Sequence, residues 1–167
     1  MALTKVRGDG VQGMSLLSSS TALSIDASGR LTTTTQVYAR MSKTADQTIN
    51  GWAKITDFTA TGTTSSAFNT TNQRFTVPIS GRYLVDARLH YGGVVAYNYT
   101  GFYINGSADN YNSGSNITWG SDTTIGGSQI IDLSANDYIE LYAYANVNVT
   151  ISGDDDVRTY FVVMLLG

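Results

Sequence analysis

Cysteine is absent from the 167 residues of the chain, and proline occurs once. Without cysteine the protein has neither a disulfide framework nor thiol chemistry. Charged side chains make up only 14% of the sequence, and the net charge of −3 is spread along the chain without a basic run. Binding to nucleic acid or to a membrane through a polybasic face is therefore not expected.

Long apolar runs and helix-forming residues are also scarce. The run YFVVMLLG at residues 160–167 is far shorter than the roughly 20 residues that a membrane-spanning helix needs. Glu140 is the only glutamate, whereas the chain contains 11 tyrosines and 17 glycines. Tyrosine favours strands and glycine favours turns, so the composition predicts an all-β protein.

Short β-rich runs recur from residue 36 onward, separated by clusters of Gly, Asn, Ser and Asp, as is typical of a sandwich or barrel. Alternation in RYLVDARLH (residues 82–90) and DYIELYAYA (residues 137–145) gives each run one apolar core face. The second face is mixed, with Leu84, Asp86, Arg88 and His90 in the first run and Tyr138, Glu140, Tyr142 and Tyr144 in the second.

The last run, residues 159–167, is apolar on both faces. A strand of this kind needs cover on both sides, because exposure forfeits roughly 1.5–3 kcal/mol for each large side chain. A two-layer sandwich supplies only one cover. The second comes from another subunit, which is the interpretation we favour, or from the N-terminal segment folding back over the strand. The second face carries Tyr160, Val162, Met164 and Leu166.

Three stretches carry a resemblance to a known family: FTVPISGRYLV (75–85), IIDLSANDYIEL (130–141) and TYFVVMLLG (159–167). In this order and spacing they resemble the motifs of the tumour necrosis factor and complement globular-head superfamily, with Asn136 where that family usually has Gly. The resemblance implies a ten-strand antiparallel jelly-roll sandwich over residues 37–167 that assembles as a homotrimer. The trimer interface that it implies comprises Leu84, Asp86, Arg88, His90, Tyr138, Tyr142, Tyr144, Tyr160, Val162, Met164 and Leu166.

Asp86 and Arg88 then suggest ion pairs near a threefold axis, which would fix register more than they add stability. A solvated surface is the alternative for these two residues. His90 is the only histidine, and it shares their strand face at ladder spacing, as structural residues do. We therefore expect neither an enzyme nor a cofactor. Asp154, Asp155 and Asp156 could offer oxygen ligands to Ca²⁺, but a solvated turn is the preferred interpretation, and no metal site is predicted.

Residues 91–121 are rich in Tyr, Asn, Gly and Ser. Tyrosine offers a large contact area at low entropic cost, and Asn and Ser offer adaptable hydrogen bonds, so the mixture suits loops that recognise glycans or proteins. Two ordinary strands with their turns explain the same composition. The candidate recognition residues are Tyr97, Tyr99, Tyr103 and Trp119.

The stretch GVQGMSLLSSSTALSIDASG (residues 10–29) has apolar side chains without a sustained helical or strand period. We expect residues 1–36 to form an anchoring arm that orders on a larger assembly, with a small hairpin turning at residues 26–29. The opening of the chain also resembles the beginnings of structural proteins of tailed bacteriophages. The predicted anchoring contacts are Val11, Met14, Leu16, Leu17, Leu23 and Ile25.

The resemblance to structural proteins of tailed bacteriophages implies that a trimer with such an arm belongs to the virion, and two functions are then open. The first is a capsid decoration (cement) protein on the outer surface of the capsid, whose arms clamp subunits of the major capsid protein. The alternative is the receptor-binding tip of a tail fibre, attached to a fibre or baseplate protein and recognising a host-surface glycan or protein. The arm is short and lacks heptads, which favours decoration.

Overall fold

The computed structural model describes residues 23–25, 31–33, 36–63, 67–94, 97–108, 112–116, 121–153 and 158–166. The chain divides into two units, residues 1–35 and 36–167, and each is described by itself. In the first unit Leu23–Ile25 (β1) pairs antiparallel with Leu31–Thr33 (β2). The predicted turn and the predicted contacts Val11, Met14, Leu16 and Leu17 lie outside the described residues.

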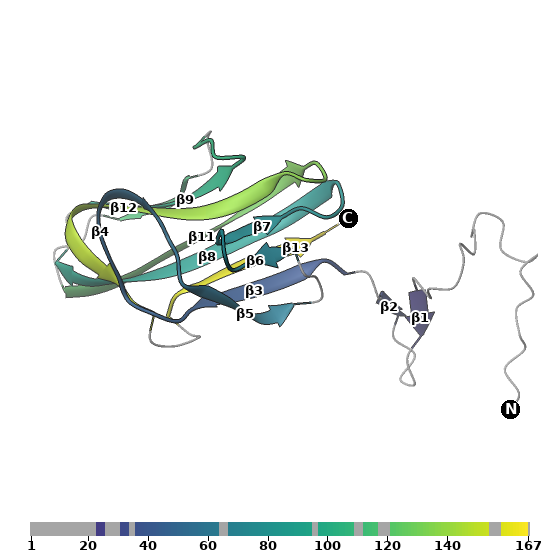
Figure 1. The fold of residues 1–167 in the computed structure, drawn as a ribbon, viewed down its shortest axis with the longest axis horizontal. Helices are drawn as coiled ribbons and strands as arrows, with labels where there is room; N and C mark the ends of the chain where they lie inside the picture. Colours follow the sequence, from purple (N-terminus) through teal and green to yellow (C-terminus); the bar gives the residue numbers. More distant parts are fainter. Residues whose placement is uncertain are drawn as a thin grey trace, which may run out of the picture. The chain divides into compact units, whose positions relative to one another are not determined.

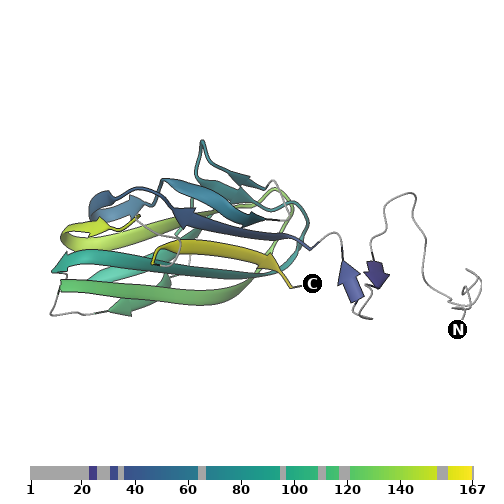
Figure 2. The same cartoon turned by 90° about the horizontal axis from the view of Figure 1, so that it is seen from below.

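Five antiparallel strands form the first layer of the second unit, in the order β11, β8, β13, β3, β5. Figure 2 shows the yellow strand β13 between β8 and β3, with the green strand β11 beyond β8. No helix long and apolar enough to cross a membrane occurs in the described part of the chain. The strand bounds are Tyr38–Lys43 (β3), Phe58–Thr63 (β5), Gly81–Val94 (β8), Ser121–Leu133 (β11) and Tyr160–Leu165 (β13).

The second layer has the order β4, β12, β9, β10, and the short pair β7 and β6 continues the β4 edge beside the start of β12 (Figure 1). At its far end β12 also pairs with β8, where Thr150 lies opposite Gly92, so the two layers join. The bounds are Gln47–Lys54 (β4), Phe68–Asn69 (β6), Arg74–Thr76 (β7), Asn98–Ile104 (β9), Asn112–Asn116 (β10) and Tyr138–Ile151 (β12).

One hydrophobic core lies between the layers. The Phe161 ring of β13 stacks on Phe102 of β9 with 6.1 Å between centroids, and it lies 6.4 Å from Phe58. The alternating core faces predicted for residues 82–90 and 137–145 are confirmed, since their odd-numbered members from Tyr83 to Leu89 and from Ile139 to Ala145 are buried. The all-β antiparallel sandwich is thus confirmed, and the described ranges of the second unit contain eleven strands, one of them the two-residue strand β6.

Asn136 shows why a residue other than glycine can stand at the turn before β12. Its φ is +75°, in the left-handed region where glycine is the usual choice and asparagine is among the better tolerated alternatives. The Asn136 amide donates to the Val77 carbonyl at 2.8 Å, and the Asp137 amide donates to the Ser134 carbonyl at 3.0 Å. The turn therefore keeps its conformation without the glycine that the family resemblance leads one to expect.

Candidate functional site

The residues predicted for the trimer interface are divided between two outer faces. The odd-numbered side chains of β8 and β12 point into the same core, so the even-numbered ones point away from it in opposite directions. The set therefore does not form one surface, which corrects the expectation that the tyrosines of β12 extend it. The first layer carries Leu84, Asp86, Arg88, His90, Tyr160, Val162, Met164 and Leu166, and the second carries Tyr138, Tyr142 and Tyr144.

An apolar row crosses the outer face of the first layer. In register, Ile130 of β11 lies opposite Leu84 of β8, which lies opposite Met164 of β13. Met164 in turn lies opposite Tyr38 of β3. Ile130 is 62% exposed, and Leu166 in the neighbouring row is 48% exposed. Contiguous exposed apolar side chains, unlike single ones, mark interaction surfaces.

Polar groups border the apolar row. The Asp86 carboxylate accepts a hydrogen bond of 2.5 Å from the Ser128 hydroxyl. The Arg40 guanidinium lies 5.1 Å from the centroid of the Tyr160 ring, in cation–π geometry. Among the described residues neither Asp86 nor Arg88 has an ion-pair partner, so their pairing with another subunit remains a prediction.

A hollow of about 470 Å³ lies beside Arg88, over the glycines of β11. Gly126 lies opposite Arg88, and a Cβ at this position would come within 2.7 Å of the Ala87 carbonyl oxygen. Only glycine fits there without moving the backbone of β8. The hollow beside Arg88 is also lined by Thr124, Ser128 and Tyr160, so its surface is mainly polar.

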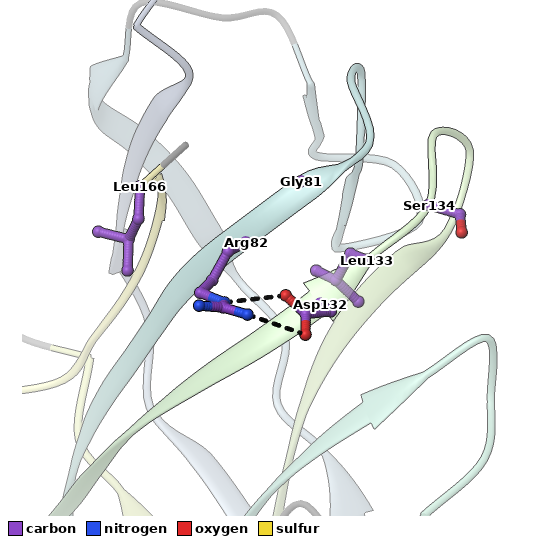
Figure 3. A pocket seen from close by; sticks show the side chains of 6 residues that line it. All are labelled: Gly81, Arg82, Asp132, Leu133, Ser134 and Leu166. Carbon is purple, nitrogen blue, oxygen red and sulfur yellow. Dashed lines mark hydrogen bonds and ion pairs between the residues drawn. The ribbon is translucent and has the colours of Figure 1, made fainter.

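An ion pair frames a second hollow at the end of the same face (Figure 3). Arg82 donates from Nε to Oδ1 of Asp132 at 3.0 Å and from Nη2 to Oδ2 at 3.5 Å. Both side chains are more than half exposed, so solvent screens the pair and it adds little to stability. The hollow has a volume of about 640 Å³, and Leu133 and Leu166 also line it. Charge thus borders the apolar row at this end.

His90 is held by a serine on this face. Its Nδ1 lies 2.9 Å from the Ser152 hydroxyl, and its amide donates to Oγ1 of Thr159 at 3.2 Å. A serine–histidine pair becomes nucleophilic when a third group orients the second ring nitrogen. Within the described ranges no carboxylate is hydrogen-bonded to His90.

Aromatic side chains gather on the outer face of the second layer. In register, Trp52 of β4 lies opposite Tyr144 of β12, which lies opposite Tyr99 of β9. The Trp52 ring centroid is 5.6 Å from that of Tyr144, 6.3 Å from that of Tyr99 and 6.1 Å from that of Tyr103. We call the group the aromatic platform, and it consists of Trp52, Tyr97, Tyr99, Tyr103, Tyr142 and Tyr144.

The aromatic platform is open to solvent although its rings contact one another. Trp52 is 45% exposed and Tyr97 is 49% exposed. Together with Tyr99 and Tyr144 they line a hollow of about 280 Å³. Tryptophan and tyrosine supply much of the binding energy at recognition surfaces because they bury a large area with few rotatable bonds. The platform is therefore the candidate ligand-binding site.

Hydrogen bonds from buried and neighbouring residues fix the backbone under the rings. The hydroxyl of the fully buried Tyr91 in β8 crosses the core and donates to the Tyr99 carbonyl at 2.9 Å. Burial raises the pKa of Tyr91, which keeps this hydroxyl protonated and able to donate. Two hydrogen bonds join Tyr97 to Asn146. The Tyr97 backbone amide donates to the side-chain Oδ1 of Asn146 at 3.0 Å, and the Asn146 backbone amide donates to the Tyr97 carbonyl at 3.2 Å.

A paired lysine and glutamate lie beside the platform. The Lys54 ammonium lies 2.5 Å from Oε1 of Glu140 and also donates to the Asn72 carbonyl at 2.7 Å. Tyr142 stacks on Tyr103 with 3.8 Å between ring centroids. Burial is the main cause that raises the pKa of Tyr142, and the negative charge of Glu140 raises it further. The Tyr142 hydroxyl is therefore protonated at neutral pH.

The structure brings together three of the four predicted recognition residues. Tyr97, Tyr99 and Tyr103 all belong to the platform, although Tyr99 and Tyr103 lie within strand β9 and not in a loop. Trp119 and the acidic run Asp154, Asp155 and Asp156 lie outside the described residues.

Sequence reasoning did not identify Trp52 or Ile130 as site residues. Both stand on the outward-facing side of a strand. For Ile130 the alternation of the strand contains the information, because Ile131 and Leu133 are buried and the residue before them must therefore face outward. For Trp52 the neighbouring positions in β4 are Gly51 and Ala53, whose small size gives little apolar alternation to show its direction.

Comparison with known proteins supports the fold alone. No family model matches the chain, and no curated protein sequence matches it significantly. Among solved structures, the Eiger TNF of S. frugiperda superposes with a TM-score of 0.63 at 11% identity, covering 79% of this chain and 93% of that one. Murine APRIL superposes with a TM-score of 0.61 at 12% identity, covering 78% and 99%. The sandwich therefore has a tumour-necrosis-factor-like fold.

The ion pair beside the platform can be tested by a double-mutant cycle. Lys54→Met leaves the nearly buried Glu140 carboxylate without its cation, and we expect the free energy of unfolding to fall by about 2 kcal/mol. In the double variant Lys54→Met/Glu140→Gln most of this loss should be recovered, because no charge remains unpaired. Urea unfolding monitored by circular dichroism measures both values. Glu140→Gln alone completes the cycle, and losses of the two single variants that sum to the loss of the double variant would show that the pair is not coupled.

Proposed function

We propose that the protein is a homotrimeric, non-enzymatic recognition module on the surface of a tailed bacteriophage, serving as the receptor-binding tip of a tail fibre. The exposed aromatic platform is the observation that carries this proposal. It lies on the outer face of the layer opposite the apolar row, so a trimer built through that row leaves every platform free. Three platforms on one particle then engage a host surface together.

The trimer rests on the chemistry of the first outer face. Ile130, Leu84 and Met164 form a continuous apolar row, and leaving such side chains in water forfeits roughly 1.5–3 kcal/mol each. Arg82 and Asp132 border the row, and an apolar centre with a polar rim is the usual anatomy of a protein interface. A homotrimer is also what the tumour necrosis factor resemblance implies.

Capsid decoration is the second candidate, and it is favoured by the division of the chain into an N-terminal unit and a sandwich. Residues 1–35 form a unit separate from the sandwich, with the strand pair β1 and β2 of its own. An arm of this kind can clamp subunits of the major capsid protein, and three arms on one trimer multiply a weak affinity through effective concentration. Under this proposal the sandwich is chiefly a trimerisation domain.

The trimer interface is tested by Met164→Asp. A carboxylate in the centre of the apolar row would be desolvated without a partner, so we expect monomers by light scattering, with the circular dichroism spectrum of the sandwich retained. Ile79→Asp is the matched control, since Ile79 is 49% exposed and lies in the turn before β8, and it should leave the oligomer unchanged. A Met164→Asp protein of unchanged mass would contradict the interface.

The receptor-binding function is tested by competition. Purified protein should bind intact host cells and block adsorption of the phage, and the monomeric Met164→Asp variant should block it at least a hundredfold less well because avidity is lost. Binding to isolated capsids without binding to cells would overturn the receptor-binding proposal in favour of decoration.

The arm separates the two candidates. Deletion of residues 1–35 should leave a soluble trimer that still binds cells, since the platform lies wholly in the second unit. The decoration proposal predicts that the same truncated trimer no longer binds capsids. Counting copies per virion gives an independent measure, because hundreds of copies indicate a shell protein and a few indicate a fibre. Full-occupancy capsid binding by the truncated protein would exclude arm-mediated decoration.

A further inference from the structure

Resting on the recognition function proposed above, we propose that the aromatic platform binds a neutral oligosaccharide, with one pyranose ring stacked on Trp52 in the hollow formed with Tyr97, Tyr99 and Tyr144. The proposal commits to a carbohydrate and not to a protein surface. Its basis is the chemistry of the rings, the state of the neighbouring charges, and the size of the hollow.

The ring of Trp52 is positioned before any ligand arrives. Three tyrosine rings lie within 6.3 Å of its centroid, and yet 45% of the side chain remains exposed. Gly101, between Tyr99 and Tyr103 on β9, carries no side chain and lies opposite Tyr142, which leaves room over the strand for the indole. A ring held this way loses little conformational entropy on binding.

Carbohydrate chemistry matches a rigid aromatic face. One face of a pyranose ring presents several C–H groups whose hydrogens are slightly positive, and an aromatic face is negative, so the two attract when stacked. The hydroxyl groups of the sugar point outward around the ring, toward phenol groups at the rim of the platform. A tyrosine hydroxyl such as that of Tyr142 is protonated at neutral pH, so it can donate as well as accept.

The charges beside the platform favour a neutral ligand. Lys54 could otherwise attract a sugar carboxylate or sulfate, but its ammonium is 2.5 Å from Glu140 and also bonded to a backbone carbonyl. Arg74 is a second cation on this face, and its guanidinium is stacked on the Tyr138 ring at 4.4 Å from the ring centroid. An acidic glycan would have to break the Lys54–Glu140 pair or draw Arg74 away from Tyr138, and a quaternary ammonium ligand would compete with Lys54 for Glu140.

The composition and size of the platform distinguish it from a protein-docking face. All six members are aromatic, whereas the outer face of the first layer carries the aliphatic side chains Ile130, Leu84 and Met164. The hollow of about 280 Å³ is near the lower end of the range for small-molecule sites, which suits a terminal sugar. The stacked pair Tyr103 and Tyr142 continues the surface for a second ring.

The test measures binding of the full-length protein to an array of immobilised neutral and acidic oligosaccharides. We expect binding to neutral hexopyranose chains, with no gain from acidic groups. Trp52→Ala should weaken it more than tenfold, Trp52→Phe should retain part of it, and Ile79→Ala, an equally exposed apolar site away from the platform, should leave it unchanged. Trimer mass and melting temperature of each variant show that the protein is folded.

A second readout uses Trp52 itself. In a Trp119→Phe background Trp52 is the one tryptophan left, since the chain has two, and titration with a bound oligosaccharide should shift its emission. Failure of every neutral oligosaccharide to bind, or undiminished binding by folded Trp52→Ala, would overturn the site.

Host cells separate this inference from the function on which it rests. Cell binding that survives periodate oxidation of surface sugars overturns the glycan site and leaves receptor binding intact, with a protein receptor as its target. Absence of cell binding in any form overturns the proposed function itself.

Discussion

The packing of β13 against β9 across one core is the constraint on which the rest of the structure depends. Phe161 stacks on Phe102 and contacts Phe58, so three strands from two layers share one cluster of rings. Since each layer packs its apolar face against this core, the remaining faces must point in opposite directions. The protein therefore has two separate outer surfaces, one on each layer.

These two surfaces differ in chemistry. One has an aliphatic row with charged groups at its border, which suits a large protein interface that excludes water. The other has rings fixed from below, by the Tyr91 hydroxyl through the core and by Asn146 at its edge. The proposals of a trimer and of a carbohydrate site follow from this difference, and each uses a face that the other leaves free.

Much of the fold could be predicted from the sequence, but less of the site could. Alternation in residues 82–90 shows which side of the strand is buried, because a register shift of one residue would turn Tyr83 and Leu89 toward solvent. The same alternation could not show that β8 and β12 belong to different layers, so Tyr142 and Tyr144 were grouped with Leu84. Trp52 is far from Tyr99 in sequence and meets it only through the register of β4, β12 and β9. Cross-strand neighbours of this kind depend on topology, which a single strand pattern does not contain.

Hydroxyl-radical footprinting of the assembled protein tests the opposition of the two faces most directly, because methionine, tryptophan and tyrosine are the side chains that oxidise most readily. With Met164 on the trimer interface and Trp52 on the free face, Met164 should be protected in the assembled protein and become oxidised in a dissociated variant. Trp52 should be oxidised to the same extent in both. Oxidation of Met164 in the intact assembly together with protection of Trp52 would contradict the account, since the platform and not the apolar row would then hold the subunits together.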